Sequence, residues 1–331
     1  MHRISVIMAI YNEKIEWMRQ SIDSILNQTF SDFEFIIIND NPQRKDNQLL
    51  TSEYSKRDKR IKVMHNEQNI GLTKSLNKGL KIAQGDYIAR MDADDIALPK
   101  RFEKQVQFLD KNKECIVCGT NISYIGDRNF FVFSDWIKYD DASIKAQLMV
   151  NSCFAHPSVM IRKKILVENG IAYDEDYKQA QDYRLWEILS HYGAFGNIKE
   201  KLLQYRISQT QVSKKHSGGQ QSLAQNIRKR ILNTWLQSIG ISEQEDNIYT
   251  YLLLNKRRII KEKVQKKGVS MKYFDAFLKY IYFSPRESKL KLFLSFYLTG
   301  DFLRMDIITN MRFVAFLIRS ERKDNNIFLL I

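Results

Sequence analysis

Cysteine, proline and glycine are all scarce in this chain, which has only 3 Cys, 4 Pro and 13 Gly among 331 residues. Three cysteines are too few for a disulfide scaffold and indicate a reducing compartment. The low glycine and proline content excludes collagen-like and proline-rich architectures. Hydrophobic residues make up 44% and charged residues 27% of the chain, so wholesale disorder is also excluded.

Long apolar runs are missing as well. No stretch of about 18 uninterrupted apolar residues occurs, so no membrane-spanning helix is expected. The first apolar run is short and meets the polar segment Tyr11-Asn12-Glu13, which does not fit a secretory signal peptide. We therefore expect a cytoplasmic protein that can also lie at the inner face of the cytoplasmic membrane.

Positive charge is in excess and is unevenly distributed. The chain has 52 Lys and Arg against 38 Asp and Glu, and residues 220–331 hold 20 of the basic and 10 of the acidic residues. The excess favours an anionic partner such as nucleic acid, an acidic membrane or a phosphorylated substrate. The same C-terminal third is rich in aromatic residues. Its helices are expected either to lie on an anionic bilayer or to pack their apolar faces against the rest of the protein.

Strand and helix patterns alternate through the first 112 residues. Nearly continuous apolar runs predict strands buried on both faces, and apolar residues at helical spacing predict helices between them. This alternation predicts an α/β fold with an open, mostly parallel sheet and helices on both faces. The predicted strands are Ile4–Ile10, Phe33–Ile38, Ile61–Met64 and Asp86–Met91, and the predicted helices are Ile15–Leu26, Leu72–Leu80 and one beginning near Pro99.

From Cys115 the pattern is less regular, and after Gly218-Gly219 it is wholly helical. We expect an α/β domain at residues 1–218, with halves 1–112 and 113–218, and a basic α-helical region at 219–331. Cys115 and Cys118 have the spacing of a metal or redox motif. They lie on a predicted strand that would point their thiols to opposite faces, so we expect neither function. The further predicted elements are strands at Ile116–Gly119, Phe130–Phe133 and Ser158–Ile161 and a helix at Asp182–Tyr192.

Polar residues follow three of the predicted buried strands. The segments are Tyr11-Asn12-Glu13, Asn39-Asp40-Asn41 and Asp92-Ala93-Asp94-Asp95. Ligands bind at the carboxyl ends of strands in open α/β sheets, although Asn and Asp are also ordinary turn residues. Three carboxylates within four residues repel one another unless a cation lies between them. The last segment therefore predicts a site for Mg²⁺ or Mn²⁺, which prefer oxygen ligands and substrate phosphates.

Six segments occur in one order and at one spacing: Ser5–Asn12, Ser24–Phe30, Asn39-Asp40, Asn69–Leu72, Gly85–Ile88 and Asp92–Asp95. In this combination the chain resembles the family 2 glycosyltransferases, which are inverting enzymes of GT-A (Rossmann-like) fold. The resemblance covers roughly residues 3–215 and implies a UDP-sugar donor and a Mn²⁺ or Mg²⁺ cofactor.

The resemblance also implies roles for individual residues. Asp40 stands where the family binds uracil, and Asp92-Ala93-Asp94 is the family's DxD motif. Asp94 would ligate the metal, Asp92 would contact the metal or the ribose, and Asp95 would lie near the sugar. Leu76 replaces a common family arginine, which leaves Lys74, Lys78 or Arg90 to contact the diphosphate. The implied nucleotide-sugar site comprises Ala9, Tyr11, Glu13, Asp40, Asn69, Lys74, Asn77, Arg90, Asp92, Ala93, Asp94 and Asp95.

On the acceptor side, Asp182 matches the family's general base, the carboxylate that removes the proton of the attacking hydroxyl. The alternative is that Asp182 is only the N-cap of a helix. His156, Gln181 and Trp186 are assigned to the acceptor side. His216 is either a third metal ligand or a residue of a solvated loop, and Arg206 is a further candidate for the diphosphate.

The resemblance implies a non-processive transferase that moves a hexose or N-acetylhexosamine to a glycan or lipid-linked acceptor. The expected setting is bacterial surface polysaccharide assembly: O-antigen, lipooligosaccharide or capsule. A processive synthase is disfavoured, because Leu185 separates Arg184 from Trp186 and no spanning helix is expected. A nucleic-acid-binding module would explain the charge but not the acidic turn, so no nucleic-acid partner is expected. An inactive scaffold remains an alternative because Gln181 and Leu76 depart from the family pattern.

Overall fold

The computed structural model describes residues 2–126, 136–208, 217–241 and 259–282. The chain forms two compact units, one of residues 1–144 with 152–227 and one of residues 145–151 with 228–331. The first unit contains the sheet, and the second is helical in its described part.

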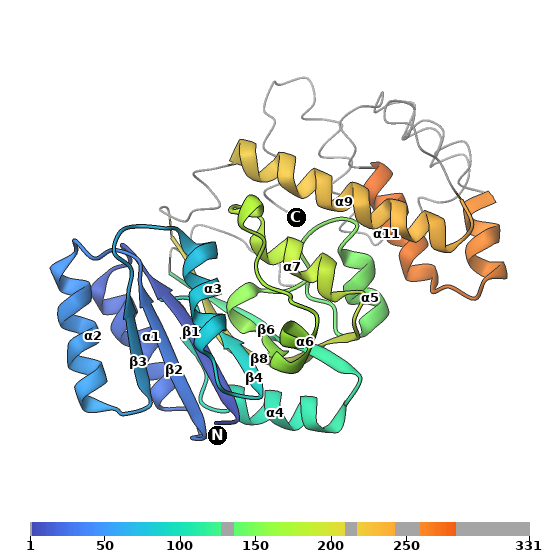
Figure 1. Cartoon of the computed structure of the whole chain (residues 1–331). Coiled ribbons are helices and arrows are strands. Elements are labelled where there is room, and N and C mark those ends of the chain that lie inside the picture. The colour runs from blue at the N-terminus through green and yellow to red at the C-terminus, as the bar shows by residue number, and fades with distance from the viewer. Residues whose placement is uncertain (1, 127–135, 209–216, 242–258, 283–331) are drawn as a thin grey trace. The chain divides into compact units, whose positions relative to one another are not determined.

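Eight strands of the first unit form one sheet in the order β3-β2-β1-β4-β7-β6-β8-β5 (Figure 1). The first four strands of that order are parallel, and β6 is parallel to β8. Antiparallel pairs join β7 to β4 and β6, and β5 to β8. The predicted open, mostly parallel sheet is therefore confirmed. The strands are β1 (Ile4–Ile10), β2 (Phe33–Asn39), β3 (Ile61–His65), β4 (Tyr87–Arg90), β5 (Ile96–Ala97), β6 (Cys115–Gly126), β7 (Met160–Arg162) and β8 (Ala194–Ile207).

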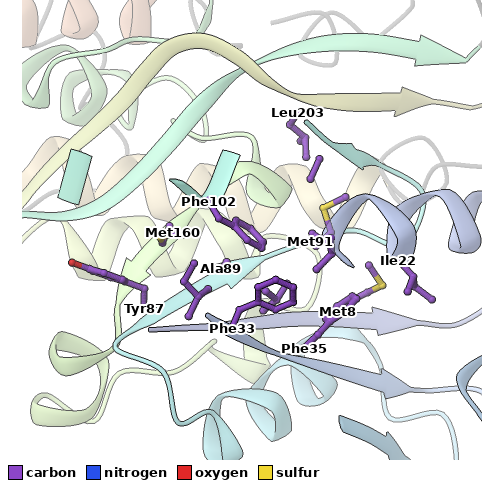
Figure 2. Close-up of a cluster of buried hydrophobic side chains, with 14 of the residues drawn as sticks. Met8, Ile22, Phe33, Phe35, Tyr87, Ala89, Met91, Phe102, Met160 and Leu203 are labelled. Carbon is purple, nitrogen blue, oxygen red and sulfur yellow. The ribbon is translucent and has the colours of Figure 1, made fainter. Parts of the chain in front are cut away.

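Helices cover both faces of the sheet. On one face, α1 (Ile15–Leu26) and α4 (Arg101–Lys111) share an apolar core with the strands. Figure 2 shows part of this core, in which the rings of Phe33 and Phe102 meet edge to face at 5.8 Å. On the other face, α3 (Leu72–Ile82) lies so close that a Cβ on Gly79 would meet Ile7 Cγ2 at 2.7 Å. Every residue of β2 is buried, as its continuous apolar run predicts.

The remaining described helices complete both units. They are α2 (Lys45–Arg57), α5 (Asp141–Gln147), α6 (Lys163–Glu168), α7 (Gln181–Leu189), α9 (Ser217–Ser238) and α11 (Met271–Tyr282), with 3-10 turns η2 (His156–Ser158) and η3 (Glu175–Tyr177). Residues 259–266 are also helical. In the second unit, Trp235, Phe274 and Phe277 are buried together in an apolar core. Over the described residues, no helix combines the length and the apolar character needed to cross a bilayer.

The sequence patterns missed α2 and gave no bounds for β8. The buried face of α2 contains Asn47 and Thr51 beside Leu50 and Tyr54, so half of it is polar and the apolar periodicity is weak. In β8 the exposed run Lys199-Glu200-Lys201 interrupts the alternation of buried and exposed residues.

Two other expectations differ from the structure in detail. Cys115 and Cys118 lie in the same apolar cluster, because an irregularity in strand pairing between Cys115 and Val117 shifts the register. Both thiols are free. The strand expected at Ser158–Ile161 begins at Met160, because η2 occupies the preceding residues. The strand expected at Phe130–Phe133 lies outside the described residues.

Candidate active site

Four carboxylates gather where the paired strands β1 and β4 end. Asp92, Asp94 and Asp95 follow β4, and Glu13 follows β1. Burial, together with the charges of Asp92 and Glu13, raises the pKa of Asp94 to about 7. Burial and the charges of Asp92 and Asp94 also raise the pKa of Asp95, which is 1% exposed. Mutual repulsion of this kind is relieved when a cation binds between the carboxylates.

The backbone of this acidic turn is held from two sides. Ser21 on α1 donates its hydroxyl to the carbonyl of Asp92 at 2.7 Å. Arg206 on β8 donates Nε to the carbonyl of Asp94 at 2.7 Å and its backbone N–H to Asp95 Oδ1 at 2.7 Å. The guanidinium that was a candidate for the diphosphate is thus engaged in shaping the turn. Ala93 contributes to the apolar core, with 2% of its surface exposed.

A buried polar pair on α4 lies beneath the turn, and the sequence analysis missed it. Arg101 has no exposed surface and donates Nη2 to the carbonyl of Arg90 at 2.8 Å and Nε to Gln105 Oε1 at 3.1 Å. Gln105 donates Nε2 to the carbonyls of Cys118 at 2.7 Å and Ser158 at 2.9 Å. Burial lowers the pKa of Arg101 to about 9. The pair ties β4, β6 and η2 together. An arginine and a glutamine four residues apart, on the face that also carries Phe102 and Leu109, were the available signal.

Arg90 is the last residue of β4 and is 2% exposed. Its Nη2 donates to Asp92 Oδ1 at 2.5 Å. The desolvation that accompanies burial opposes its charge, but the neighbouring carboxylate of Asp92 outweighs this and raises the pKa of Arg90. Arg90 therefore remains a cation and balances part of the negative charge of the acidic turn. It lies under the carboxylates instead of on the open surface.

Asp40 orders the turn at the start of α3. It is 4% exposed, and its carboxylate accepts hydrogen bonds from Asn66 Nδ2 at 2.7 Å and from the N–H groups of Ile70 and Gly71 at 2.9 Å. Gly71 has φ 86°, a left-handed conformation that favours glycine. Asn69 is exposed, and its Oδ1 accepts from the N–H of Gly71 at 3.0 Å.

Tyr11 stands beside Asp40 at the same edge of the sheet, and 42% of its surface is exposed. Its backbone is fixed by Glu13 Oε2, which accepts from its N–H at 2.7 Å, and by Asn47 Nδ2, which donates to its carbonyl at 2.8 Å. Ala9, two residues earlier in β1, is partly exposed. The exposed ring is available to a planar ligand.

The two predicted donor-site residues of α3 contact a segment from later in the chain. Lys74 Nζ lies 3.8 Å from Glu175 Oε2, and the side chain of Asn77 bonds to the backbone of Tyr173. Lys78, the other candidate lysine, donates Nζ to Asn66 Oδ1 at 2.9 Å. The contacts of Lys74 and Asn77 join α3 to the segment that follows α6.

Asp182 is the second residue of α7 and not its N-cap, which is Ala180. Ser152 donates its hydroxyl to Asp182 Oδ2 at 3.3 Å. Burial raises the pKa of Asp182, although the N–H of Tyr183 and the Ser152 hydroxyl oppose the rise. A carboxylate whose pKa is raised towards neutral pH is a better proton acceptor than an ordinary aspartate.

Two of the predicted acceptor-side residues, His156 and Trp186, pack together, and His156 also pairs with a tyrosine. His156 Nε2 lies 2.8 Å from the hydroxyl of Tyr173, a residue that the sequence analysis did not single out. Burial, and then the charge of Arg90, lowers the pKa of His156, so the imidazole is neutral. Trp186 has no exposed surface and packs against His156 with ring centroids 6.0 Å apart. Trp186 therefore packs against the His156 ring from the protein interior and has no surface to offer a ligand. Gln181 is 9% exposed, and its Oε1 is buried without a partner among the described groups.

The acidic turn fits a hard divalent cation, although the described residues do not form a complete protein-made site. No three His, Cys, Asp or Glu side chains in the described part of the chain converge on one point. His216 lies outside the described residues. Asp92, Asp94 and Glu13 supply only oxygen donors, and burial together with the charges of Asp92 and Glu13 raises the pKa of Asp94. Such ions take their remaining ligands from phosphates and water.

The sequence of the chain is similar to those of known proteins. The sequence pattern described as Glycosyl transferase family 2 matches residues 5–170. The uncharacterized glycosyltransferase MJ1057 of Methanocaldococcus jannaschii is 41% identical over 207 residues, which are 62% of this chain and 70% of the relative. The O-antigen biosynthesis glycosyltransferase WbnJ of Escherichia coli is 34% identical over 245 residues, which are 71% of this chain and 93% of WbnJ.

A solved structure shares the fold. Residues 1–349 of S. aureus TarS, crystallised with UDP-GlcNAc, align with a TM-score of 0.56 at 17% identity. The alignment covers 84% of this chain and 90% of the TarS chain.

Proposed function

The chain belongs to glycosyl transferase family 2, and we propose that it transfers a hexose or N-acetylhexosamine from a UDP-sugar to a hydroxyl group, with inversion and without processivity. The observation that carries the proposal is the partly buried acidic cluster of Glu13, Asp92 and Asp94 at the ends of β1 and β4. A separate carboxylate with a raised pKa, Asp182, belongs to the same compact unit.

The donor nucleotide would lie along the carboxyl ends of β1 and β2. Tyr11 offers an exposed ring to a base, and Asp40 is held in place at the start of α3. Each carboxylate oxygen has more than one lone pair, so Asp40 can accept a further N–H from uracil. UDP as the nucleotide is also supported by TarS, whose structure contains UDP-GlcNAc.

Asp94 and Asp92 would hold Mn²⁺ or Mg²⁺. When bound, such a cation offsets the charge that develops on the diphosphate leaving group. Ser21 and Arg206 fix the backbone of the turn, so the carboxylates are oriented before the donor arrives. Preorganised groups of this kind stabilise a transition state without paying a reorganisation cost during the reaction.

Asp182 would accept the proton of the acceptor hydroxyl. As that oxygen bonds to the anomeric carbon, the bond from this carbon to the diphosphate oxygen breaks, and UDP leaves with the electron pair. One displacement inverts the configuration at the anomeric carbon. The neutral His156 and Tyr173 would shape the acceptor side of the site.

The acceptor is proposed to be a glycan or a lipid-linked sugar in surface polysaccharide assembly. The similarity to WbnJ, which is named for O-antigen biosynthesis, supports this setting. The excess of basic residues in 220–331 supports contact with an anionic membrane at the cytoplasmic side.

Release of UDP from UDP-glucose, UDP-galactose, UDP-GlcNAc and UDP-GalNAc, with and without Mn²⁺, tests the proposal. We expect one donor to release UDP only with the metal, and Asp94→Asn to abolish the release. Asp32→Asn is the matched control, because Asp32 is exposed and precedes β2, at the opposite end of the parallel strands from the acidic turn. Absence of binding by every UDP-sugar would contradict the role of Asp40. Binding without turnover, even with sugar acceptors added, would favour the inactive scaffold.

A further inference from the structure

The guanidinium of Arg90 has hydrogen-bonding capacity that the protein does not use. Nη2 is paired with Asp92, but Nε and Nη1 are buried and have no partner among the residues that the structure describes. Buried polar groups are nearly always paired, because an unpaired charged donor carries its full desolvation cost. The residue is 2% exposed, so bulk water does not satisfy these N–H groups freely. This indicates that a ligand supplies the acceptor atoms.

Arg90 lies between the two sides of the proposed reaction. Its charge interacts with Asp92 on the donor side and with Asp182 on the acceptor side. It also interacts with Tyr173 and His156. In a single displacement the transferred sugar must occupy the space between the carboxylate near the diphosphate and the carboxylate that accepts the proton. Arg90 is thus placed beside the sugar.

Neighbouring polar side chains on the acceptor side already have hydrogen-bond partners within the protein. The Tyr173 hydroxyl is paired with His156, and Asp182 Oδ2 accepts from Ser152. The proposed function assigns the diphosphate to a cation held by Asp94 and Asp92, and a phosphate held without that cation would be repelled by the carboxylates of the turn. A sugar hydroxyl accepts a hydrogen bond from a guanidinium and adds no charge. The guanidinium fork can also reach two adjacent hydroxyls at once.

We propose that Nε and Nη1 of Arg90 donate hydrogen bonds to hydroxyl oxygens of the donor hexose, so that Arg90 determines which sugar is accepted. This inference rests on the proposed function and assigns the donor sugar to a particular side chain. It also separates Arg90 from the diphosphate contacts for which it was a candidate.

The test is a thermodynamic cycle in which a sugar hydroxyl, the Arg90 guanidinium, or both are removed. The wild type and Arg90→Lys are assayed with the UDP-hexose that the wild type uses and with its 2-, 3-, 4- and 6-deoxy forms. In the wild type we expect one or two deoxy donors to lose about 10- to 100-fold in kcat/KM, the range for a hydrogen bond to a charged donor. In Arg90→Lys, which keeps the charge beside Asp92, the parent donor should fall to the level of those deoxy donors, with no further loss on deoxygenation.

Arg162→Lys is the matched control. Arg162 donates Nε to the carbonyl of Cys115 at 2.8 Å and pairs with Tyr87 at the start of β4, the end away from the acidic turn. Arg162→Lys should lose the same factors in kcat/KM as the wild type when each deoxy donor replaces the parent donor. If thermal melting shows that Arg90→Lys is unfolded, Arg90→Gln takes its place in the same cycle.

If removing a sugar hydroxyl lowers kcat/KM by the same factor in the wild type and in the folded Arg90 variant, the role of Arg90 is overturned. The transferase proposal would remain intact. A wild type that neither binds nor hydrolyses any UDP-hexose would overturn both. The two failures are therefore distinguishable.

Discussion

The side-chain amide of Asn77 pairs with both backbone polar groups of Tyr173. Nδ2 donates to the carbonyl at 2.9 Å, and Oδ1 accepts from the N–H at 2.9 Å. The Asn77 amide on α3 thereby forms the two hydrogen bonds that a neighbouring β-strand would otherwise form with the backbone of Tyr173. The two residues are 96 positions apart in the chain. The pairing sets the position of Tyr173, whose hydroxyl meets His156.

Replacing Asn77 by alanine should destabilise the protein and lower transfer. Because Tyr173 is 6% exposed, its N–H and carbonyl would be left without partners, at a cost of about 1–3 kcal/mol in the free energy of unfolding. Urea unfolding measures this loss. Asn169→Ala is the control, since Asn169 is exposed and its amide bonds only to Ile165 of its own helix. Equal stability of the two variants would show that the pairing with Tyr173 contributes nothing.

Asp182→Asn should lower kcat by about 10²- to 10⁴-fold with little change in donor KM, because the amide cannot accept the proton. The pH profile gives a second readout. Only the ionised carboxylate acts as a base, and burial raises its pKa, so the rate of the wild type should rise with pH through a pKa above the ordinary aspartate range. An acid limb at the ordinary range, or an active Asp182→Asn enzyme, would show that another group is the base.

Metal affinity should depend on pH near neutrality. The pKa of Asp94 is raised to about 7 in the metal-free protein, so protons compete with the cation below that pH. We expect Mn²⁺ binding, measured by calorimetry, to tighten between about pH 6 and about pH 8. Asp94→Asn should bind weakly at both. Removal of metal with EDTA should abolish UDP release, and Mn²⁺ should restore it. Binding that is independent of pH would assign the metal to other ligands.

Arg101→Met should destabilise the protein by about 3 kcal/mol, since it leaves the carbonyl of Arg90 and Oε1 of Gln105 without their donor. Arg57→Met is a matched control, because the Arg57 side chain is 65% exposed and its ion pair with Asp23 is a surface contact of 3.8 Å. Thermal unfolding of both variants gives the comparison. A shift no larger than that of the control would mean that the buried pair on α4 does not brace β4.

Glu34 should make stability depend on acidity. Its side chain is fully buried, and burial alone would raise its pKa, but Lys62, the Ser5 hydroxyl and the N–H of Gln84 hold the pKa below its ordinary 4.5. The stabilisation is therefore present above the unfolded-state pKa and is lost as pH falls through the lower folded-state pKa. The unfolding free energies of the wild type and Glu34→Gln should therefore differ near neutral pH and converge as the pH falls below the folded-state pKa of Glu34.

The control for this experiment is Glu67→Gln, because Glu67 is exposed. It should follow the wild type at both pH values. At neutral pH we expect Glu34→Gln to be less stable by about 1–3 kcal/mol. A constant difference between wild type and Glu34→Gln at all pH values would refute the ionised state of Glu34.

Local patterns were sufficient to predict much of the sheet and of the acidic turn. The runs at Ile4–Ile10 and Phe33–Ile38 are apolar because both faces are covered, and Asp92–Asp95 are close in sequence as well as in space. What was missed is nonlocal. Nothing near Asn77 indicates that its partner is Tyr173, and nothing near Arg101 indicates that it bonds to the carbonyl of Arg90.

Polar burial explains the other omissions. A buried helix face is recognised in a sequence by the spacing of its apolar residues. Helix α2 instead buries Asn47 and Thr51, because Asn47 bonds to the carbonyl of Tyr11 after β1 and Thr51 bonds to the carbonyl of Asn47 in the helix. The same reason hides Gln105, whose amide satisfies two carbonyls in the interior. Side chains that bond to backbone in the interior leave a polar signature that hydropathy cannot distinguish from exposure.

The contacts of Arg206 with Asp94 and Asp95 have a consequence for synthesis on the ribosome. The two partners are separated by more than 100 residues, because Asp95 Oδ1 accepts the N–H of a residue 111 positions later. β5, directly after the acidic turn, pairs with that same late strand. A nascent chain that has emerged only through α4 therefore carries the whole motif in its sequence but lacks the strand that shapes it. The turn reaches its final form only once β8 has left the exit tunnel, so premature termination before β8 would yield a chain that keeps the motif without its geometry.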